Sequence, residues 1–397
     1  MKFEIKSSNL LKILKKIIKI TLSNTNYEEL SCFLLEIEND KIVLTASNGN
    51  LSMKTELEKN DEYLKIIKTG SVLINAKIMH DIFNKLEDEW FLFELKINNL
   101  IISNFKNNNN NDFIFKLSTM TIEKFPKITF YKEIENKVSF KKTLLQNIND
   151  QIAFAINTNN NSKPALTGIN FKFSNKKLYI TATDGYCLAK KTIPYLEEIK
   201  VDNKEFNIPV YLLNEIDKIT NDLNKNVNFY FENNLNLIIE IDNYLFQTRM
   251  IEGIYPNTDD IIKNILEKEK TIVEINNVKD FLNIIELSII LSKKDTSPMI
   301  QFLINTRTND FKINCLSNND NIGEVIEQFK KFNFIKNKNI DEQIKVVFNS
   351  KLIIHAIKSF YKCKTISLSI SWPKKYTIIQ SEEEIGLLQL VLPIGEK

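Results

Sequence analysis

Histidine and glycine are scarce in this sequence of 397 residues, which contains 2 histidines, His80 and His355, and 8 glycines. The glycines are scattered and form no phosphate-cradling loop, and no helix carries the paired histidines of a zinc hydrolase. Each histidine sits within an amphipathic helical pattern, which favours a core or surface role. The sequence therefore predicts no catalytic residue, no metal site and no cofactor, and it argues against a hydrolase or nucleotide-dependent enzyme.

Cysteine is equally sparse, with 4 residues that lie far apart and lack metal-ligand spacing: Cys32, Cys187, Cys315 and Cys363. This usage is typical of a reducing compartment, so we expect buried or idle thiols and no disulfides. No stretch approaches the length of a membrane span, and Met1–Ile5 alternates like a strand. A cytoplasmic location without a membrane partner is the prediction.

Net charge is also small, because 53 basic residues face 50 acidic ones. A net charge of +3 is too small for a protein that binds nucleic acid through its overall charge alone, so any basic surface must be local. The chain is longer than one hydrophobic core usually supports, which indicates two to four domains.

One pattern recurs three times along the chain and predicts three copies of one domain. Each copy opens with a short alternating strand and an amphipathic helix, which begins near Ser7, Lys141 and Val278. A hairpin follows, then a second helix that begins near Asn75, Pro209 and Asn349, and then further hairpins. The predicted domains are residues 1–130, 131–266 and 267–397. The predicted fold class is α+β, with two helices per copy packed on antiparallel sheets.

Lysines gather on one face of the first helix. Lys12, Lys15, Lys16 and Lys19 follow helical spacing, while Leu10, Leu11, Leu14, Ile17 and Ile18 form the other face. Lys141 and Lys142 open the second copy, and Lys358 lies in the last helix of the third. These lysines are candidates for salt-sensitive, sequence-independent contacts with DNA phosphates. A solvated helix face remains the alternative interpretation.

Three polar stretches predict turns. Asn107–Asn111 is expected to be a solvated hairpin tip, and Asp184-Gly185 a hairpin turn. The adjacent acids Asp259 and Asp260 could coordinate a cation, but a solvated turn is the favoured interpretation.

Three segments, 181–189, 252–256 and 390–394, carry a Thr-Asp-Gly hairpin, a Gly-x-Tyr-Pro loop and a hydrophobic-Pro-hydrophobic tail. Together with the triplication, they resemble the bacterial DNA polymerase III beta subunit, the beta sliding clamp family, over the whole length. The resemblance implies a head-to-tail dimeric ring of six domains around duplex DNA. It also implies a non-catalytic processivity factor that tethers the replicative polymerase. The implied partners are duplex DNA, a second copy of the chain, the polymerase, an ATP-dependent clamp loader and other clamp-binding replication and repair proteins.

The resemblance further implies an apolar pocket for a short partner peptide. The residues that match it are Leu166, Thr183, Gly185, Tyr186, Cys187, Leu188, Pro256, Ile261, Leu390, Leu392 and Pro393. Tyr186 and Cys187 stand where the family often has His-Arg, and Asp260 and Asn24 stand where it often has arginines, Asn24 at a position that contacts DNA. We therefore expect a less basic pocket rim, and ordinary core and turn roles are the alternative for these residues.

For the dimer, the resemblance implies that Ile290 and Leu291 of one copy face Phe115 and Leu117 of the other. The main competing hypothesis is a triplicated DNA-binding or interaction scaffold that never closes a ring. Head-to-tail dimerisation around DNA is expected of a clamp and not of such a scaffold, so it distinguishes the two hypotheses.

Overall fold

The computed structural model describes residues 1–397 except 23–25, 105–112, 133–136, 158–162, 195–202, 219–221, 233–235, 291–297, 317–325, 337–342 and 396–397. The chain forms two compact units. One consists of Met1–Thr143 and Asn214–Met250, and the other of Leu144–Leu213 and Ile251–Lys397. The predicted hairpin tip at Asn107–Asn111, as well as Asn24 and Leu291, lies outside the described residues.

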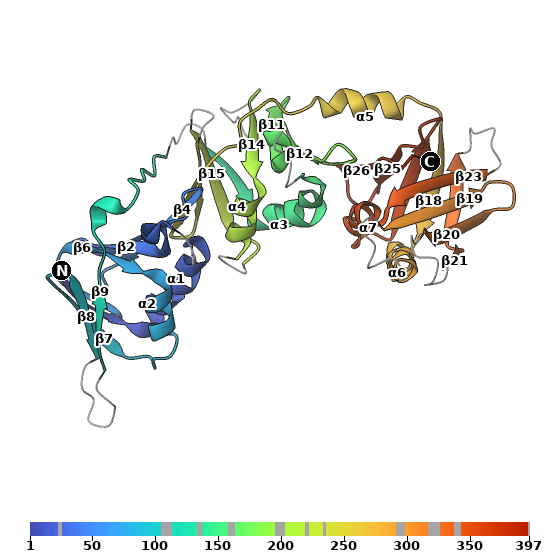
Figure 1. Ribbon diagram of the computed structural model, residues 1–397. Coiled ribbons are helices and arrows are strands. Elements are labelled where there is room, and N and C mark those ends of the chain that lie inside the picture. The colour runs from blue at the N-terminus through green and yellow to red at the C-terminus, as the bar shows by residue number, and fades with distance from the viewer. Residues whose placement is uncertain are drawn as a thin grey trace. The chain divides into compact units, whose positions relative to one another are not determined.

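The first unit contains a five-stranded antiparallel sheet that ends on β9 (Figure 1). In spatial order its strands are β5 (Leu64–Lys68), β1 (Lys2–Lys6), β7 (Trp90–Lys96), β8 (Asn99–Asn104) and β9 (Ile114–Ser118). Alternate residues of β1 point inward, and the buried Phe3 stacks on Phe93 of β7 with ring centroids 4.6 Å apart. This alternation is the period of two that Met1–Ile5 shows in the sequence.

The second sheet of this unit has eight antiparallel strands and joins two of the sequence copies. Its order is β10 (Lys137–Lys141), β15 (Asn226–Glu232), β16 (Asn236–Ile241), β17 (Tyr244–Arg249), β4 (Leu51–Glu58), β3 (Lys41–Ser47), β2 (Cys32–Ile37) and β6 (Gly70–Asn75). The junction is the pairing of β17 with β4, in which Gln247 lies opposite Ser52. A continuous sheet therefore crosses the border that the sequence places near residue 130.

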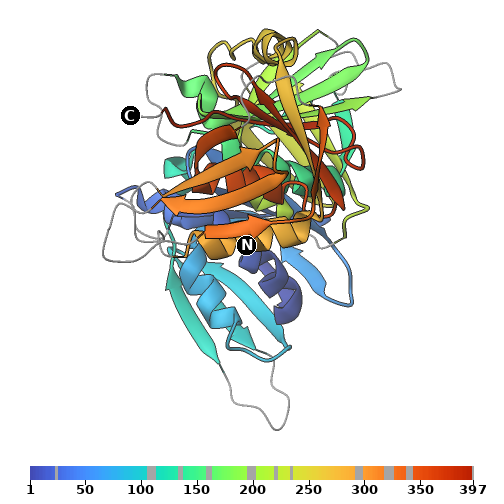
Figure 2. The same cartoon turned by 90° about the vertical axis from the view of Figure 1, so that its right-hand side faces the viewer.

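Helices α1 (Ser7–Ile20) and α2 (Ala76–Phe83) pack side by side in the first unit (Figures 1 and 2). The buried face of α1 consists of Ser7, Leu10, Ile13, Leu14, Ile17 and Ile20. The sequence had assigned Leu11 and Ile18 to this face, but both are only half-buried, because positions three and four apart from Leu10 lead to Ile13 and Leu14 instead. Asn75 caps α2 by accepting a hydrogen bond from the Ile78 amide at 3.0 Å.

The second unit repeats this plan with a nine-stranded and a four-stranded antiparallel sheet. The larger sheet is β14 (Glu205–Pro209), β11 (Gly168–Ser174), β12 (Lys177–Thr183), β13 (Cys187–Pro194), β26 (Leu387–Val391), β25 (Thr377–Gln380), β24 (Thr365–Ser371), β18 (Lys270–Asn276) and β22 (Phe332–Lys336). The smaller is β21 (Ile326–Phe329), β20 (Asp310–Leu316), β19 (Met299–Asn305) and β23 (Gln343–Asn349).

The remaining helices begin close to the predicted positions. They are α3 (Lys142–Gln151), α4 (Val210–Asp217), α6 (Val278–Ser288) and α7 (Ser350–Lys358), and α6 packs against α7. Short 3-10 turns occupy Glu28–Ser31, Ile122–Lys124, Ala153–Ala155 and Pro164–Thr167. The α+β prediction, with few helices on antiparallel sheets, is confirmed.

One helix was missed by the sequence analysis. Asp259 and Asp260 do not form a solvated turn, because they lie in the first turn of α5 (Thr258–Leu266). Asn257 precedes this helix as its cap, and acidic side chains at a helix N-terminus are stabilised by the helix dipole. The local signals for a turn and for a capped helix start are the same residue types, and only the buried Ile262 and Ile265 distinguish them.

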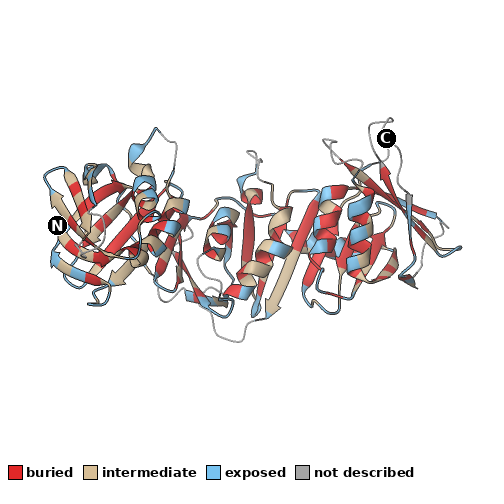
Figure 3. Cartoon of the chain, turned by 90° about the horizontal axis from the view of Figure 1, so that it is seen from below, coloured by how far each residue is buried: buried red, intermediate tan, exposed pale blue. Residues whose placement is uncertain are grey.

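Buried residues concentrate on the strands and on the inner faces of the helices (Figure 3). All four cysteines are free and buried, as predicted. No helix in the described part of the chain is both long and apolar enough to cross a membrane.

Candidate functional site

A tight turn connects β12 to β13 at Thr183–Cys187. The Asp184 carboxylate accepts hydrogen bonds from the amides of Tyr186 and Cys187, both at 2.7 Å. Thr183 Oγ1 accepts from the Gly185 amide at 3.1 Å and donates to the Cys187 carbonyl at 2.6 Å. Gly185 has a φ of +93°, which a residue with a side chain rarely adopts. The predicted hairpin turn at Asp184-Gly185 is confirmed.

An apolar cluster begins one residue after this turn. Leu188 on β13 lies opposite Leu390 on β26, and Leu390 in turn lies opposite Ile378 on β25. The buried members of this apolar cluster are Leu188, Ile262, Ile265, Ile378, Leu388 and Leu390, and the partly exposed Tyr376 and Leu392 pack against them. The arrangement is a buried apolar floor with partly exposed apolar residues beside it.

The sequence named three members of the apolar cluster: Leu188, Leu390 and Leu392. It missed the two isoleucines of α5, although the step of three from Ile262 to Ile265 is a helical signal. Ile261, which the sequence named, is 45% exposed, whereas its neighbour Ile262 is 8% exposed. Ile378 on β25, Leu388 on β26 and Tyr376, in the turn before β25, are brought to Leu188 only by the tertiary fold.

Helix α5 is held against the sheet by ion pairs as well as by its isoleucines. Asp259 forms an ion pair with Lys190 of β13, and Lys172 of β11 lies 3.5 Å from the same carboxylate. Burial acts to raise the pKa of Asp259, but the two lysines outweigh it, so the pKa of this carboxyl lies below its ordinary value. The acid that the sequence placed in a turn therefore helps to anchor α5.

Two further predicted pocket residues lie around the loop before α5. Leu166 packs with Ala165 and Tyr255 in a small cluster of their own, and Pro256 is exposed. The Gly253 carbonyl accepts a hydrogen bond from Asn207 Nδ2 at 2.9 Å, which ties this loop to β14. The loop thus positions the start of α5.

The remaining predicted pocket residues surround the turn. Tyr186 is 69% exposed, and its carbonyl accepts a hydrogen bond from the Leu392 amide at 2.9 Å, which places Leu392 and the half-buried Pro393 next to the turn. Cys187 is buried outside the apolar cluster, because successive strand residues point to opposite faces. Burial raises the pKa of its thiol far above the ordinary value.

The lysines of α1 are mostly exposed, as expected. Lys12, Lys15 and Lys19 are exposed, whereas Lys16 is half-buried with its ammonium 4.1 Å from the ring centroid of Tyr244. Burial lowers the pKa of Lys16, and burial raises the pKa of Tyr244 to about 12. Three of the four lysines are therefore available to an external anion.

The structure corrects the prediction that Lys142 faces DNA. Its side chain is 3% exposed, and its ammonium donates to the Asp217 carbonyl at 2.8 Å and lies 3.3 Å from the Asp217 carboxylate. A lysine that is buried with partners on α4 does not reach a phosphate. Lys141 and Lys358 are exposed, which fits the prediction for them.

The predicted interface residues lie on sheet edges or exposed turns. Phe115 and Leu117 are half-buried on β9, the edge strand of the five-stranded sheet. Ile290 follows α6 and is 49% exposed. The edge strand β21 packs against α6.

No group of three or more histidine, cysteine or acidic side chains that could hold a metal ion occurs among the residues that the structure describes. His80 lies in α2 and His355 in α7, where its ring stacks on Phe154 with centroids 5.6 Å apart. Burial, followed by the charge of Lys358, lowers the pKa of His355.

Comparison with protein families identifies the family to which this architecture belongs. The model of the DNA polymerase III beta subunit N-terminal domain matches residues 1–129, and that of the central domain matches residues 139–257. Together the matches cover more than half of the chain. The chain belongs to the DNA polymerase III beta subunit family, the beta sliding clamps.

Members of the clamp family align with nearly the whole chain. The beta sliding clamp of Mycoplasma capricolum is 28% identical over 401 residues, which is 99% of each chain. That of Bacillus subtilis is 24% identical over 99% of each chain. The crystal structure of the Bacillus subtilis sliding clamp superimposes with a TM-score of 0.86 at 23% identity and covers 100% of both chains. The Streptococcus pyogenes beta subunit gives a TM-score of 0.84 at 21% identity, also over 100% of both chains.

Proposed function

We propose that this chain is a sliding clamp, a non-catalytic processivity factor that dimerises head to tail into a ring around duplex DNA and tethers the replicative polymerase. The observation that carries the proposal is the full-length similarity to beta sliding clamps, which extends through both compact units. In this proposal the chain divides into three clamp domains, 1–130, 131–266 and 267–397, each supplying two helices.

The DNA-facing role is assigned to the exposed lysines Lys12, Lys15, Lys19, Lys141 and Lys358, with a smaller contribution from the half-buried Lys16. A closed ring holds DNA topologically, so it needs only loose phosphate contacts that salt weakens. Strong directional contacts would oppose sliding. The three exposed lysines of α1 are consistent with this requirement.

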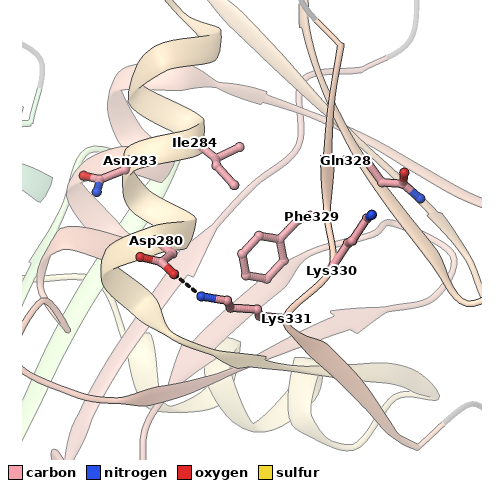
Figure 4. A pocket seen from close by; sticks show the side chains of 7 residues that line it. All are labelled: Asp280, Asn283, Ile284, Gln328, Phe329, Lys330 and Lys331. Atoms are coloured by element: carbon pink, nitrogen blue, oxygen red, sulfur yellow. Dashed lines mark hydrogen bonds and ion pairs between the residues drawn. The ribbon is translucent and has the colours of Figure 1, made fainter.

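For ring closure, we propose that the edge strand β9 of one copy pairs with the edge strand β21 of another. Exposed strand edges pair readily with other strands, and each of these strands forms one edge of its sheet. Beside β21, a hollow of about 360 Å³ lies between the strand and α6 (Figure 4). Its lining includes Ile284, Phe329 and the ion pair of Asp280 with Lys331. Ile290 follows at the end of α6, where Phe115 and Leu117 of the second copy would lie.

The apolar cluster around Leu188 and Leu390 is assigned as the floor of a pocket for partner peptides. Tyr186, Ile261, Leu392 and Pro393 are exposed or half-buried and would surround the bound segment. Such a pocket suits a short segment with apolar anchors, carried by the polymerase, the ATP-dependent clamp loader and other replication and repair proteins.

The topological function is tested by light scattering together with retention on nicked circular DNA, loaded with the cognate loader. We expect a dimer of about twice 46.3 kDa that stays on circles and leaves after linearisation. A monomer that binds circles and linear DNA alike, in a salt-sensitive way, would support the open scaffold instead.

The interface is tested by replacing Ile290 with aspartate. We expect monomers in sedimentation, because a charge at the centre of an apolar contact is left without a partner. Ile385→Asp, at an isoleucine that is 84% exposed between β25 and β26, is the matched control. A dimer that survives Ile290→Asp at the wild-type dissociation constant would rule out this interface.

The pocket is tested with Leu188→Asp and fluorescence anisotropy of a labelled polymerase peptide. We expect binding to disappear while light scattering still shows the dimer. Unchanged peptide affinity would refute the pocket assignment.

A further inference from the structure

A cluster of aromatic and basic side chains lies next to the apolar cluster around Leu188. It is formed by the turn between β24 and β25, which contains Trp372, Lys374, Lys375 and Tyr376, and by Lys268 after α5. The Trp372 amide donates to the Glu269 carbonyl at 2.8 Å, which fixes this turn beside the connection between α5 and β18. We call these five residues the cationic rim.

Tyr376 connects the cationic rim to the apolar cluster. Its ring packs against the buried residues of that cluster and remains partly exposed. The ammonium of Lys268 lies 5.8 Å and that of Lys374 lies 5.9 Å from the centroid of the same ring. Lys375 lies 5.8 Å from the ring centroid of Trp372. Two positive charges therefore flank one tyrosine at the border of the apolar surface.

The charge of Lys268 and Lys374 is not neutralised locally. No ion pair joins either side chain to a carboxylate in the described part of the chain. The nearest acids in sequence, Glu267 and Glu269, are exposed, and Glu267 lies 3.9 Å from Lys263. Lysines that are placed around one ring repel each other, and an external anion would relieve this repulsion.

We propose that the cationic rim binds an acidic side chain of the partner peptide, next to the apolar anchors that enter the cluster around Leu188. This inference rests on the proposed peptide pocket and adds a specificity determinant to it. The carboxylate would lie between Lys268 and Lys374 while the adjacent apolar anchor covers Tyr376. The continuity of the cationic rim with the apolar cluster favours a peptide over a nucleic acid, which would require a longer basic groove.

The N-terminal end of α5, which is the end farther from Lys268, has the opposite charge. Asp260 on α5 is exposed, and its carboxylate accepts a hydrogen bond from Asn257 Nδ2 at 2.7 Å. A peptide with an acid at one end of its apolar anchors is then oriented, because its carboxylate is attracted to the cationic rim and repelled by Asp260. The rim thus determines direction as well as affinity.

The test uses the full-length dimer and two labelled eight-residue peptides with identical leucine and phenylalanine anchors. One peptide carries two aspartates beside the anchors and the other carries two lysines. We expect the aspartate peptide to bind the wild type roughly fivefold more tightly, the size that two exposed ion pairs provide. We expect the double variant Lys268→Glu with Lys374→Glu to lose or reverse this preference, and Lys351→Glu, an exposed lysine of α7, to keep it.

The outcomes separate this inference from the proposed pocket. If both peptides bind equally well and the double variant changes neither affinity, the cationic rim has no role although the pocket stands. If neither peptide binds the wild type, or if Leu188→Asp leaves binding intact, the pocket itself is wrong. If instead the double variant loses only the binding of a labelled oligothymidylate, the occupant is a single-stranded nucleic acid and the peptide inference is overturned.

Discussion

Two turns, one in each compact unit, have matching backbone hydrogen bonds but different residues beside them. In the first unit, Asn48 Oδ1 accepts from the amides of Asn50 and Leu51 at 3.0 and 2.8 Å, and Ser47 Oγ accepts from Gly49 at 3.1 Å. These bonds repeat those of Thr183 and Asp184 in the second unit. The repeat is thus preserved at the level of individual hydrogen bonds.

The residue after each turn differs, and so does the surface. In the second unit Leu188 lies opposite Leu390, whereas in the first Ser52 lies opposite Gln247. Ser52 donates to Ser47 Oγ at 2.9 Å, and Gln247 Oε1 is buried without a hydrogen bond among the described residues. Identical strand pairings therefore support an apolar floor in one unit and a polar contact in the other. A repeated backbone does not by itself repeat a binding site.

The largest expected effect comes from making the second unit resemble the first. Leu188→Ser removes a side chain that is 3% exposed from the apolar cluster. We expect unfolding free energy to fall by about 2–4 kcal/mol and peptide affinity to fall at least tenfold. Denaturant unfolding and peptide anisotropy measure the two effects.

The matched change in the first unit is Ser52→Ala. It removes only the hydrogen bond to Ser47, so about 1 kcal/mol of stability and no peptide affinity should be lost. If Leu188→Ser and Ser52→Ala lowered the unfolding free energy and the peptide affinity by equal amounts, the two regions would not differ as described.

An intermediate effect is expected from the two turn glycines. Gly49 has φ +90° and Gly185 has φ +93°, and an added Cβ meets only Leu30 Cδ1 at 3.9 Å in the first and nothing within 4 Å in the second. Gly49→Ala and Gly185→Ala should therefore each lower the unfolding free energy by about 1–2 kcal/mol through backbone strain alone. Thermal unfolding of both variants checks this equality, and a much larger cost at one turn would show that the backbones are not equivalent.

The smallest effects concern the ion pairs that anchor the connecting segments. Asp259 pairs with Lys190 in the second unit, and Glu240 pairs with Lys132 in the first. Burial opposes ionisation of both carboxylates, but the lysines beside Asp259, and Lys132 with hydrogen bonds from Tyr230 and Asn228 beside Glu240, hold the two pKa values below the ordinary 3.8 and 4.5. A lowered pKa in the folded state contributes stability above the ordinary value, and this contribution is lost as pH falls through the lowered pKa.

Asp259→Asn and Glu240→Gln should therefore reduce stability near neutral pH by similar, small amounts. The difference from the wild type should shrink as the pH falls below about 4, because the wild-type carboxylates are then protonated too. Urea unfolding between neutral and acid pH measures the difference, and a gap that widens in acid would contradict the assigned pKa directions.

The amino-acid sequence determined much of the local structure of this protein. Helix starts at Val278 and Ser350 and the Asp184-Gly185 turn follow from capping residues, glycine and helical spacing, which act within a few residues. The threefold repeat and the clamp resemblance also lie in the sequence. It did not distinguish the capped start of α5 from a turn, since Asn-Thr-Asp-Asp serves both.

Only the tertiary structure decided which side chains meet. Lys142 looked like its exposed neighbour Lys141 until α4 placed Asp217 beside it. Ile262, Ile378 and Leu390 come from separate parts of the chain and meet Leu188 only because β13, β25, β26 and α5 pack together. The physical reason is that burial and charge pairing depend on long-range strand pairing, which no local pattern specifies.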